Sequence, residues 1–143
     1  MIVSDERVAL TPVESLALLN DAPVGRIVFT DQTLPAVEPV YFTMDDDAVI
    51  VRTTAGSRLA RSIHDSIVAF EVDNSDLEPG SGWSVTALGR AEVVTEPTEL
   101  ARLSLLPSDG MELTAPVHYV RIRLRRIHGY RVAVERCEVT PHV

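Results

Sequence analysis

The stretch that decides the fold is residues 50–58, which read IVRTTAGSR. We expect a strand that ends in hydroxyl side chains, a close turn at the glycine and a helix that begins near Ser57. Period-two spacing places Arg52 and Thr54 on one strand face, while Ser57 and Arg58 lie at the start of the helix. Two guanidinium groups, hydroxyls and main-chain amides in this order predict a phosphate site. The alternative is a plain turn in which Ser57 only caps the helix and both arginines are solvated.

The segments around this stretch alternate between β-rich runs and turn formers. We expect strands at residues 25–29, 36–44, 48–53, 67–73 and 83–95. Short helices are expected at residues 12–20, 57–64 and 97–106. Residues 117–127 and 130–136 are expected to form a final hairpin that turns at His128-Gly129. Together they predict a mainly β fold, a closed or partly closed antiparallel barrel with short helices, in a single domain covering residues 1–143.

The composition excludes several classes of protein. With 13 basic and 21 acidic residues, the 143-residue chain carries a formal charge of -8, which argues against general nucleic-acid binding. All the basic residues are arginine, so Schiff-base chemistry on a lysine is excluded and any anion must be held by guanidinium groups. A single cysteine, no secretory signal and no long apolar run predict a soluble cytoplasmic protein that does not enter a membrane.

Two further segments are candidates for contact with a flat ligand. Trp83 follows Gly80-Ser81-Gly82 and precedes Ser84, so close backbone approach and stacking on the indole are both available. Pro39-Val40-Tyr41 places a proline inside a strand-like run, which leaves neighbouring main-chain groups without a ladder partner. The plainer interpretations are a tryptophan in the core and an ordinary edge strand.

The remaining candidate clusters point to no particular chemistry. The four histidines and Cys137 lack metal-ligand spacing, so no metal site is predicted. No hydrolase or Walker motif is present, and no residue stands out as a catalytic acid or base. Residues 121–136 hold six of the arginines, partly on alternate positions, which predicts either a basic face for an acidic ligand or cross-strand pairs with Glu71 or Glu92.

Taken in order, these segments resemble the pyridoxamine 5'-phosphate oxidase-like family of FMN-binding split barrels, in particular its small flavin-nucleotide-binding branch. The resemblance covers most of the chain and depends on the order and spacing of its motifs. They are a leading helix with Glu14 and Leu19, Gly25-Arg26-Ile27, Pro39-Val40-Tyr41, VRTTAGS at residues 51–57, VAFEVD at 68–73, GWSV at 82–85, Gly89-Arg90-Ala91 and His128-Gly129-Tyr130-Arg131.

The resemblance implies a homodimer that holds FMN at the subunit interface and oxidises or reduces a small molecule. The phosphate would be bound at the end of the third strand and in the next helix, by Arg52, Thr53, Thr54, Ser57 and Arg58. Many relatives have a lysine at the next position, where this chain has Leu59.

The resemblance also implies how the flavin ring is held. The main chain of residues 37–42 would lie along the isoalloxazine, with Pro39, Val40 and Tyr41 beside it. Trp83 and Ser84 would complete the pocket, either within the chain or from the partner subunit.

Two alternative functions stay open. A deazaflavin-dependent reductase would use the same barrel, and its longer anionic cofactor would suit the arginine-rich strand at residues 121–125. A non-catalytic module that binds flavin or haem is the second alternative, with His64 and His118 as the axial-ligand candidates. A flavin absorbance band or a haem Soret band would separate these functions.

Overall fold

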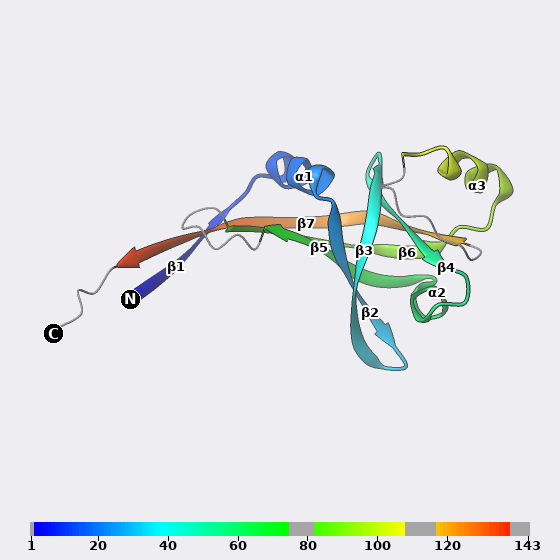
Figure 1. The fold of residues 1–143 in the computed structure, drawn as a ribbon, viewed down its shortest axis with the longest axis horizontal. Coiled ribbons are helices and arrows are strands. Elements are labelled where there is room, and N and C mark those ends of the chain that lie inside the picture. Colours follow the sequence, from blue (N-terminus) through cyan, green and yellow to red (C-terminus); the bar gives the residue numbers. More distant parts are fainter. Residues whose placement is uncertain (1, 75–81, 108–116, 138–143) are drawn as a thin grey trace.

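The computed structural model describes residues 2–74, 82–107 and 117–137. The helices are α1 (Pro12–Asp21), α2 (Arg58–Ile63) and α3 (Pro97–Ser104). The strands are β1 (Ile2–Ala9), β2 (Val24–Asp31), β3 (Leu34–Asp45), β4 (Ala48–Thr54), β5 (Ser66–Asn74), β6 (Gly82–Val93) and β7 (Val117–Cys137). Figure 1 shows their arrangement.

The strands form an antiparallel barrel. Their order is β1-β7-β4-β3-β2-β5-β6, and an additional pairing between β6 and β7 closes the sheet. β7 crosses most of the molecule in Figure 1 because it pairs with β4, β6 and β1 in turn along its length. The expected mainly β barrel with short helices is therefore confirmed.

The C-terminal strand corrects the expected hairpin at His128-Gly129. β7 continues through this dipeptide, and its end pairs with β1, a strand that the sequence did not predict. Gly129 serves close packing instead of a turn: a Cβ atom added there would lie 2.4 Å from the Ser15 Oγ of α1. The main-chain amide of Leu10 also donates to the Gly129 carbonyl at 2.8 Å.

Period-two burial explains the barrel core. In β2, Gly25, Ile27 and Phe29 are buried while the residues between them are not. The Phe42 and Phe70 rings meet edge to face inside the barrel, with centroids 4.8 Å apart. Alternation of this kind is the pattern expected when one face of a strand packs on a core and the other faces outward.

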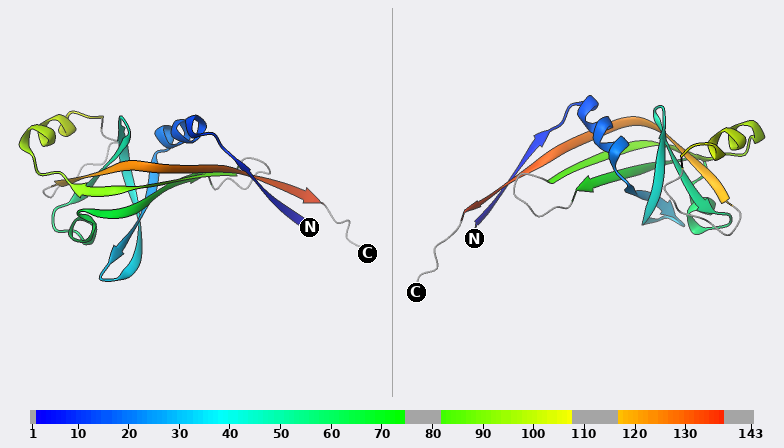
Figure 2. Two further views of the ribbon diagram at one scale, coloured as in Figure 1. Left: turned by 180° about the vertical axis from the view of Figure 1, so that it is seen from behind. Right: turned by 45° about the horizontal axis from the view of Figure 1, so that its top comes forward.

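The expected turns and the first helix are confirmed. Gln32 and Asp46, in the β2–β3 and β3–β4 turns, have φ values of 50° and 52°, so both connections are tight. Thr11 and Glu14 form the predicted capping box at α1. In Figures 1 and 2, α1 and α3 lie on one side of β7, whereas α2 lies on the other side, next to the β2–β3 hairpin.

Ion pairs fasten α3 to the barrel. Arg102 donates to both carboxylate oxygens of Asp45, at 3.0 and 2.8 Å, and also contacts Glu99. The buried Arg121 donates to Glu99 at 2.9 Å and to Glu92 at 3.4 Å. Of the two expectations for the arginines of β7, pairing with an acidic neighbour is therefore confirmed at Glu92.

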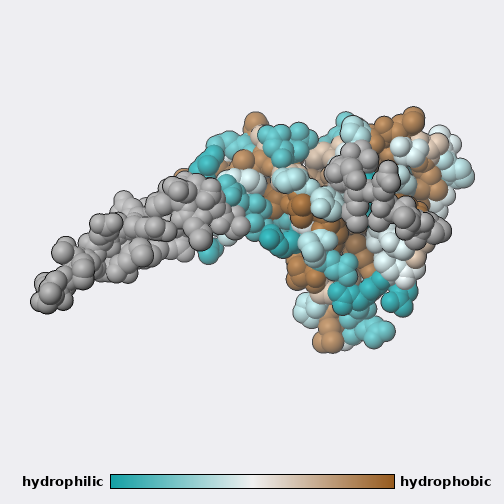
Figure 3. All heavy atoms as spheres, viewed as in Figure 1, coloured by the Kyte–Doolittle hydropathy of each residue, from teal (hydrophilic) through white to brown (hydrophobic). Residues whose placement is uncertain are grey.

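None of the described helices combines the length and the apolar character that crossing a bilayer requires. On the face shown in Figure 3, hydrophobic residues reach the surface in several places between hydrophilic ones.

Candidate functional site

The turn between β4 and α2 has the local structure that the sequence predicted. Gly56 has a φ of 78°, a conformation that favours glycine, and Ser57 caps α2 by accepting from the Ala60 amide at 3.1 Å. The Thr53 and Ser57 hydroxyl oxygens lie 2.8 Å apart. The two hydroxyls are thus held together at one point, where the strand enters the helix.

Arg58, at the start of α2, points to the β2–β3 hairpin. Its Nε and Nη2 donate to Glu38 Oε1 at 3.2 and 3.1 Å, and its Nε lies 3.7 Å from Asp31 Oδ2. Its guanidinium carbon lies 5.6 Å from the centroid of the Phe29 ring. The side chain is still 48% exposed, so a ligand can reach it. The next residue, Leu59, is only 1% exposed and belongs to the core.

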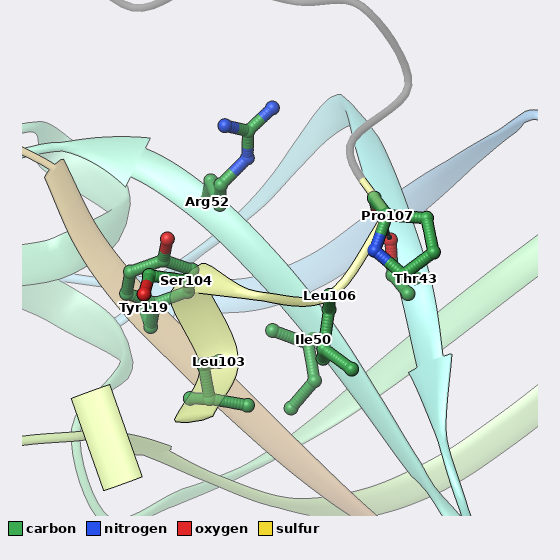
Figure 4. A pocket seen from close by; sticks show the side chains of 8 residues that line it. All are labelled: Thr43, Ile50, Arg52, Leu103, Ser104, Leu106, Pro107 and Tyr119. Atoms are coloured by element: carbon green, nitrogen blue, oxygen red, sulfur yellow. Dashed lines mark hydrogen bonds between the residues drawn. The ribbon is translucent and has the colours of Figure 1, made fainter. Parts of the chain in front are cut away.

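The structure does not bring Arg52 together with Arg58. Arg52 shares its face of β4 with Ile50, under α3, whereas Thr53 shares the opposite face with Val51 of the barrel core. A cavity of about 120 Å³ lies here between α3 and the barrel. In Figure 4, the Arg52 guanidinium extends away from the apolar part of this cavity.

The cavity under α3 has an apolar floor and a polar rim. Its apolar lining residues are Ile50, Leu103 and Leu106, and its polar ones include Arg52, Ser104 and Tyr119. Thr43 also lines it and donates from its hydroxyl to the Pro107 carbonyl at 3.1 Å. This composition suits a small molecule with an apolar body and a polar or anionic end.

The barrel is split next to the two hydroxyls. The β3–β4 ladder runs from Asp45↔Ala48 only as far as Phe42↔Val51. If the same register continued, Tyr41, Val40 and Pro39 would face Arg52, Thr53 and Thr54. Among the described residues, both segments instead keep only their other strand neighbours, β2 for residues 39–41 and β7 for residues 52–54. The predicted ring segment and the predicted phosphate segment therefore lie on the two sides of one opening.

His118 adds a group that sequence reasoning did not assign to this opening. It is the β7 partner of Thr53, so both side chains lie on the same face of the sheet. Its Nδ1 is buried and has no hydrogen-bond partner in the part of the chain that the structure describes. A buried polar atom without a partner is rare in proteins and calls for an explanation.

Trp83 and Ser84 lie at the other end of the barrel. Thr53 pairs with His118 of β7, whereas Trp83 pairs with Arg131 of the same strand. Thirteen residues along β7 correspond to roughly 40 Å at 3.3 Å per residue. Within one chain, the structure does not bring Trp83 and Ser84 to the split.

A second polar cluster lies on the outer face of β2 and β5. Arg26 Nη1 contacts Glu71 Oε2 at 3.4 Å and Asp73 Oδ2 at 3.0 Å. Burial, and a hydrogen bond and repulsion from Asp73, raise the pKa of Glu71 to about 7, although Arg26 opposes the change. Arg26 also pairs across the ladder with Pro39, so this cluster adjoins the β3 edge of the split.

Comparison with known proteins agrees with this geometry. Residues 11–131 match the family model described as "Pyridoxamine 5'-phosphate oxidase". The chain belongs to this family. The match contains the whole split, from the β2–β3 hairpin to the first residues of β7.

Several known proteins are similar to most of the chain. The FAD binding protein of Mycobacterium smegmatis is 32% identical, with a TM-score of 0.75 over 88% of this chain and 98% of that one. A candidate pyridoxamine 5'-phosphate oxidase of Corynebacterium glutamicum is 28% identical, with a TM-score of 0.79 over 93% and 98% of the two chains. The uncharacterised protein Rv0080 of Mycobacterium tuberculosis is 36% identical over 106 residues, which are 71% of this chain and 70% of the relative.

The histidines named as haem-ligand candidates lie in different surroundings. His64 follows α2, and its Nδ1 accepts from the Val93 amide at 3.1 Å. His118 is the β7 partner of Thr53, and its Nδ1 is buried. No group of three or more potential metal-ligating side chains occurs in the part of the chain that the structure describes.

Proposed function

We propose that this protein binds a flavin nucleotide in the split between β3 and β4 and uses it to oxidise or reduce a small molecule. The observation that carries this proposal is the end of the β3–β4 ladder at Phe42↔Val51, beside a cluster of side chains that can donate hydrogen bonds to a phosphate. The 32% identity to an FAD binding protein supports a flavin as the ligand.

The residues at the split fit a flavin phosphate. Thr53 and Ser57 offer hydroxyls 2.8 Å apart, Arg58 offers a guanidinium, and the unpartnered Nδ1 of His118 lies on the face of Thr53. Hydroxyl and guanidinium donors of this kind are those that proteins use for phosphate oxygens. In this proposal Arg52 does not contact the phosphate, because its side chain lies on the opposite face of β4.

The edge of β3 suits the isoalloxazine ring. Residues 39–41 have no strand partner on the side of β4 among the described residues, so their main-chain groups can bind the polar edge of a ring. The flavin, when bound, supplies hydride or electron transfer, while the protein orients it and limits access to it. The cavity under α3 lies next to the split and is our proposed position for the small-molecule substrate.

We also propose a homodimer. Val37 and Tyr41 of β3 are apolar or aromatic side chains that are 56% and 46% exposed on the outer face of the barrel, next to the split. A second copy would cover them and would bring its own Trp83 and Ser84 to the flavin. This arrangement accounts for the distance between Trp83 and Thr53 within a single chain.

The proposal is tested by titrating the purified protein with FMN, FAD and riboflavin and following flavin fluorescence. Ser57→Ala and Arg58→Ala should each weaken FMN binding by about five- to fiftyfold, because each removes a hydrogen bond to a charged phosphate. Riboflavin, which lacks the phosphate, should bind the variants and the wild type equally.

The alternatives give different results in the same experiment. If the wild type bound none of the three flavins, the proposal would be wrong. A Soret band after addition of haem, or binding of a deazaflavin alone, would then favour the corresponding alternative function.

A further inference from the structure

The cation of the proposed phosphate site already faces two carboxylates. Glu38 Oε1 accepts from both Nε and Nη2 of Arg58, and Asp31 Oδ2 lies 3.7 Å from the same Nε. The two carboxylates come from the two strands of one hairpin, β2 and β3. Their combined charge exceeds that of the single guanidinium which they contact.

This arrangement is fixed by more than one contact. Ser62 Oγ of α2 donates to Asp31 Oδ1 at 3.1 Å, which holds Asp31 against the helix. The Phe29 ring lies below the Arg58 guanidinium. Glu38 is the β3 partner of Ile27, a fully buried residue, so the position of its backbone is set by the barrel core.

The residue that follows Arg58 adds no positive charge to offset the two carboxylates. Leu59 is buried in the core, and Arg52 lies on the other face of β4. Arg61, in the last turn of α2, lines a pocket with Asp31. A phosphate that approaches Ser57 and Arg58 therefore meets the Arg58 guanidinium accompanied by Glu38 and Asp31, with Arg61 on the side of Asp31. Such a site penalises a ligand in proportion to the negative charge that it places there.

Flavin nucleotides differ in how much of this charge lies on the phosphate next to the ribityl chain. The phosphate of FMN is a monoester and carries about −1.5 to −2 at pH 7. In FAD the phosphate next to the ribityl chain is joined by an anhydride to a second phosphate, and each of the two carries a single negative charge, so the charge is spread over two groups instead of one. A site whose arginine is offset by two carboxylates discriminates between these groups even when both make the same hydrogen bonds.

We propose that Glu38, assisted by Asp31, makes this protein select FAD over FMN by placing negative charge beside the phosphate-binding arginine. The inference rests on the proposed flavin function and assigns to Glu38 a role in specificity. In this role Glu38 lowers the affinity for FMN by repulsion, so that selectivity does not depend on attraction of FAD alone.

The test compares affinities for FMN, FAD and riboflavin in the wild type and in Glu38→Gln. The wild type should bind FAD more tightly than FMN. Glu38→Gln should raise FMN affinity about two- to fivefold, the range expected for a partly exposed charge pair, with a smaller gain for FAD and none for riboflavin. The ratio between FMN and FAD isolates the charge effect, because the adenosine contacts of FAD are the same in both proteins.

The matched control is Glu96→Gln. Glu96 precedes α3 and makes no side-chain capping hydrogen bond. Its replacement by glutamine changes the net charge by the same amount as Glu38→Gln. It should leave all three affinities unchanged. Raising the salt concentration with the wild type should also narrow the gap between FMN and FAD, because screening weakens repulsion between exposed charges.

Each outcome decides the inference. A wild type that binds flavins without preferring FAD, or a Glu38→Gln variant that gains equally for FMN and FAD, overturns it while leaving the flavin proposal intact. A wild type that binds no flavin overturns the proposed function itself. Asp31→Asn supplies the same comparison if Glu38→Gln does not give a native far-ultraviolet spectrum and a cooperative melt.

Discussion

At the scale of single residues, the raised pKa of the Glu71 carboxyl predicts how the stability of the protein depends on pH. Its pKa of about 7 in the folded protein lies above its ordinary value of 4.5. The folded state therefore retains a proton that the unfolded state loses, so this group lowers stability as pH rises from about 4.5 to 7. Glu71→Gln should remove this loss, and the variant should gain stability relative to the wild type between pH 5 and pH 8.

Urea denaturation at several pH values measures this difference. Arg102 lowers the pKa values of Asp45 and Glu99, so these two carboxylates act in the opposite direction, losing stability as pH falls. Their effect belongs to pH values below about 4.5, outside the range of the measurement. Parallel pH dependences for Glu71→Gln and the wild type would contradict the assignment.

Residue-level patterns predicted one part of the candidate site and missed another. The strand-turn-helix geometry around Thr53 and Ser57 was predicted because hydroxyls and a glycine between a strand and a helix are a local signal. The partners of Arg58 were not found, because Glu38 and Asp31 lie 20 and 27 positions earlier and are brought close only by the β2–β3 hairpin. His118 was noted only as a haem-ligand candidate, and its place beside Thr53 depends on strand register.

At the scale of elements, β2 depends on a glycine for its fit to β5. A Cβ atom on Gly25 would lie 2.2 Å from Phe70 Cζ, inside the barrel core. The Phe70 ring is in turn packed edge to face on Phe42, so it cannot move freely. Gly25→Ala should destabilise the fold by about 1–3 kcal/mol through overpacking.

Thermal or urea unfolding measures this loss of stability. Ala36→Gly is the contrasting variant, because Ala36 lies on β3 and is only partly buried. The double variant Gly25→Ala with Phe70→Leu should regain part of the loss, since the smaller side chain leaves room for the methyl group. A Gly25→Ala variant as stable as the wild type would show that the ring yields at little cost.

Elements were predicted well where the signal was local. The two hairpins, the capping box of α1 and the start of α2 all follow from turn formers and cap residues. The prediction of a turn at His128-Gly129 was wrong, because glycine occurs both in turns and where two elements pack closely. Only the contact with Ser15 shows that close packing is the reason here. The pairing of β1 with β7 is a contact between chain ends, which has no local signature.

At the scale of the whole molecule, the barrel closes while the ladder between β3 and β4 stops short of the ends of both strands. The ladder ends at Phe42↔Val51. At this point the hydroxyls of Thr53 and Ser57, which can donate to a phosphate, lie near the edge of β3 that β4 no longer covers. The ion pairs of Arg102 and Arg121 hold α3 over the neighbouring cavity. The fold thus positions the proposed cofactor site and the cavity proposed for the substrate near the same end of the β3–β4 ladder, while Trp83 of the same chain remains at the far end.

The crystal structure of the protein with bound flavin tests this account most directly. We predict a flavin phosphate within hydrogen-bond distance of Ser57 and Arg58, an isoalloxazine ring along residues 39–41, and Trp83 of a second copy beside it. A flavin bound elsewhere on the barrel, or a β3–β4 ladder extended through Tyr41 and Arg52 with no ligand between the strands, would contradict the account.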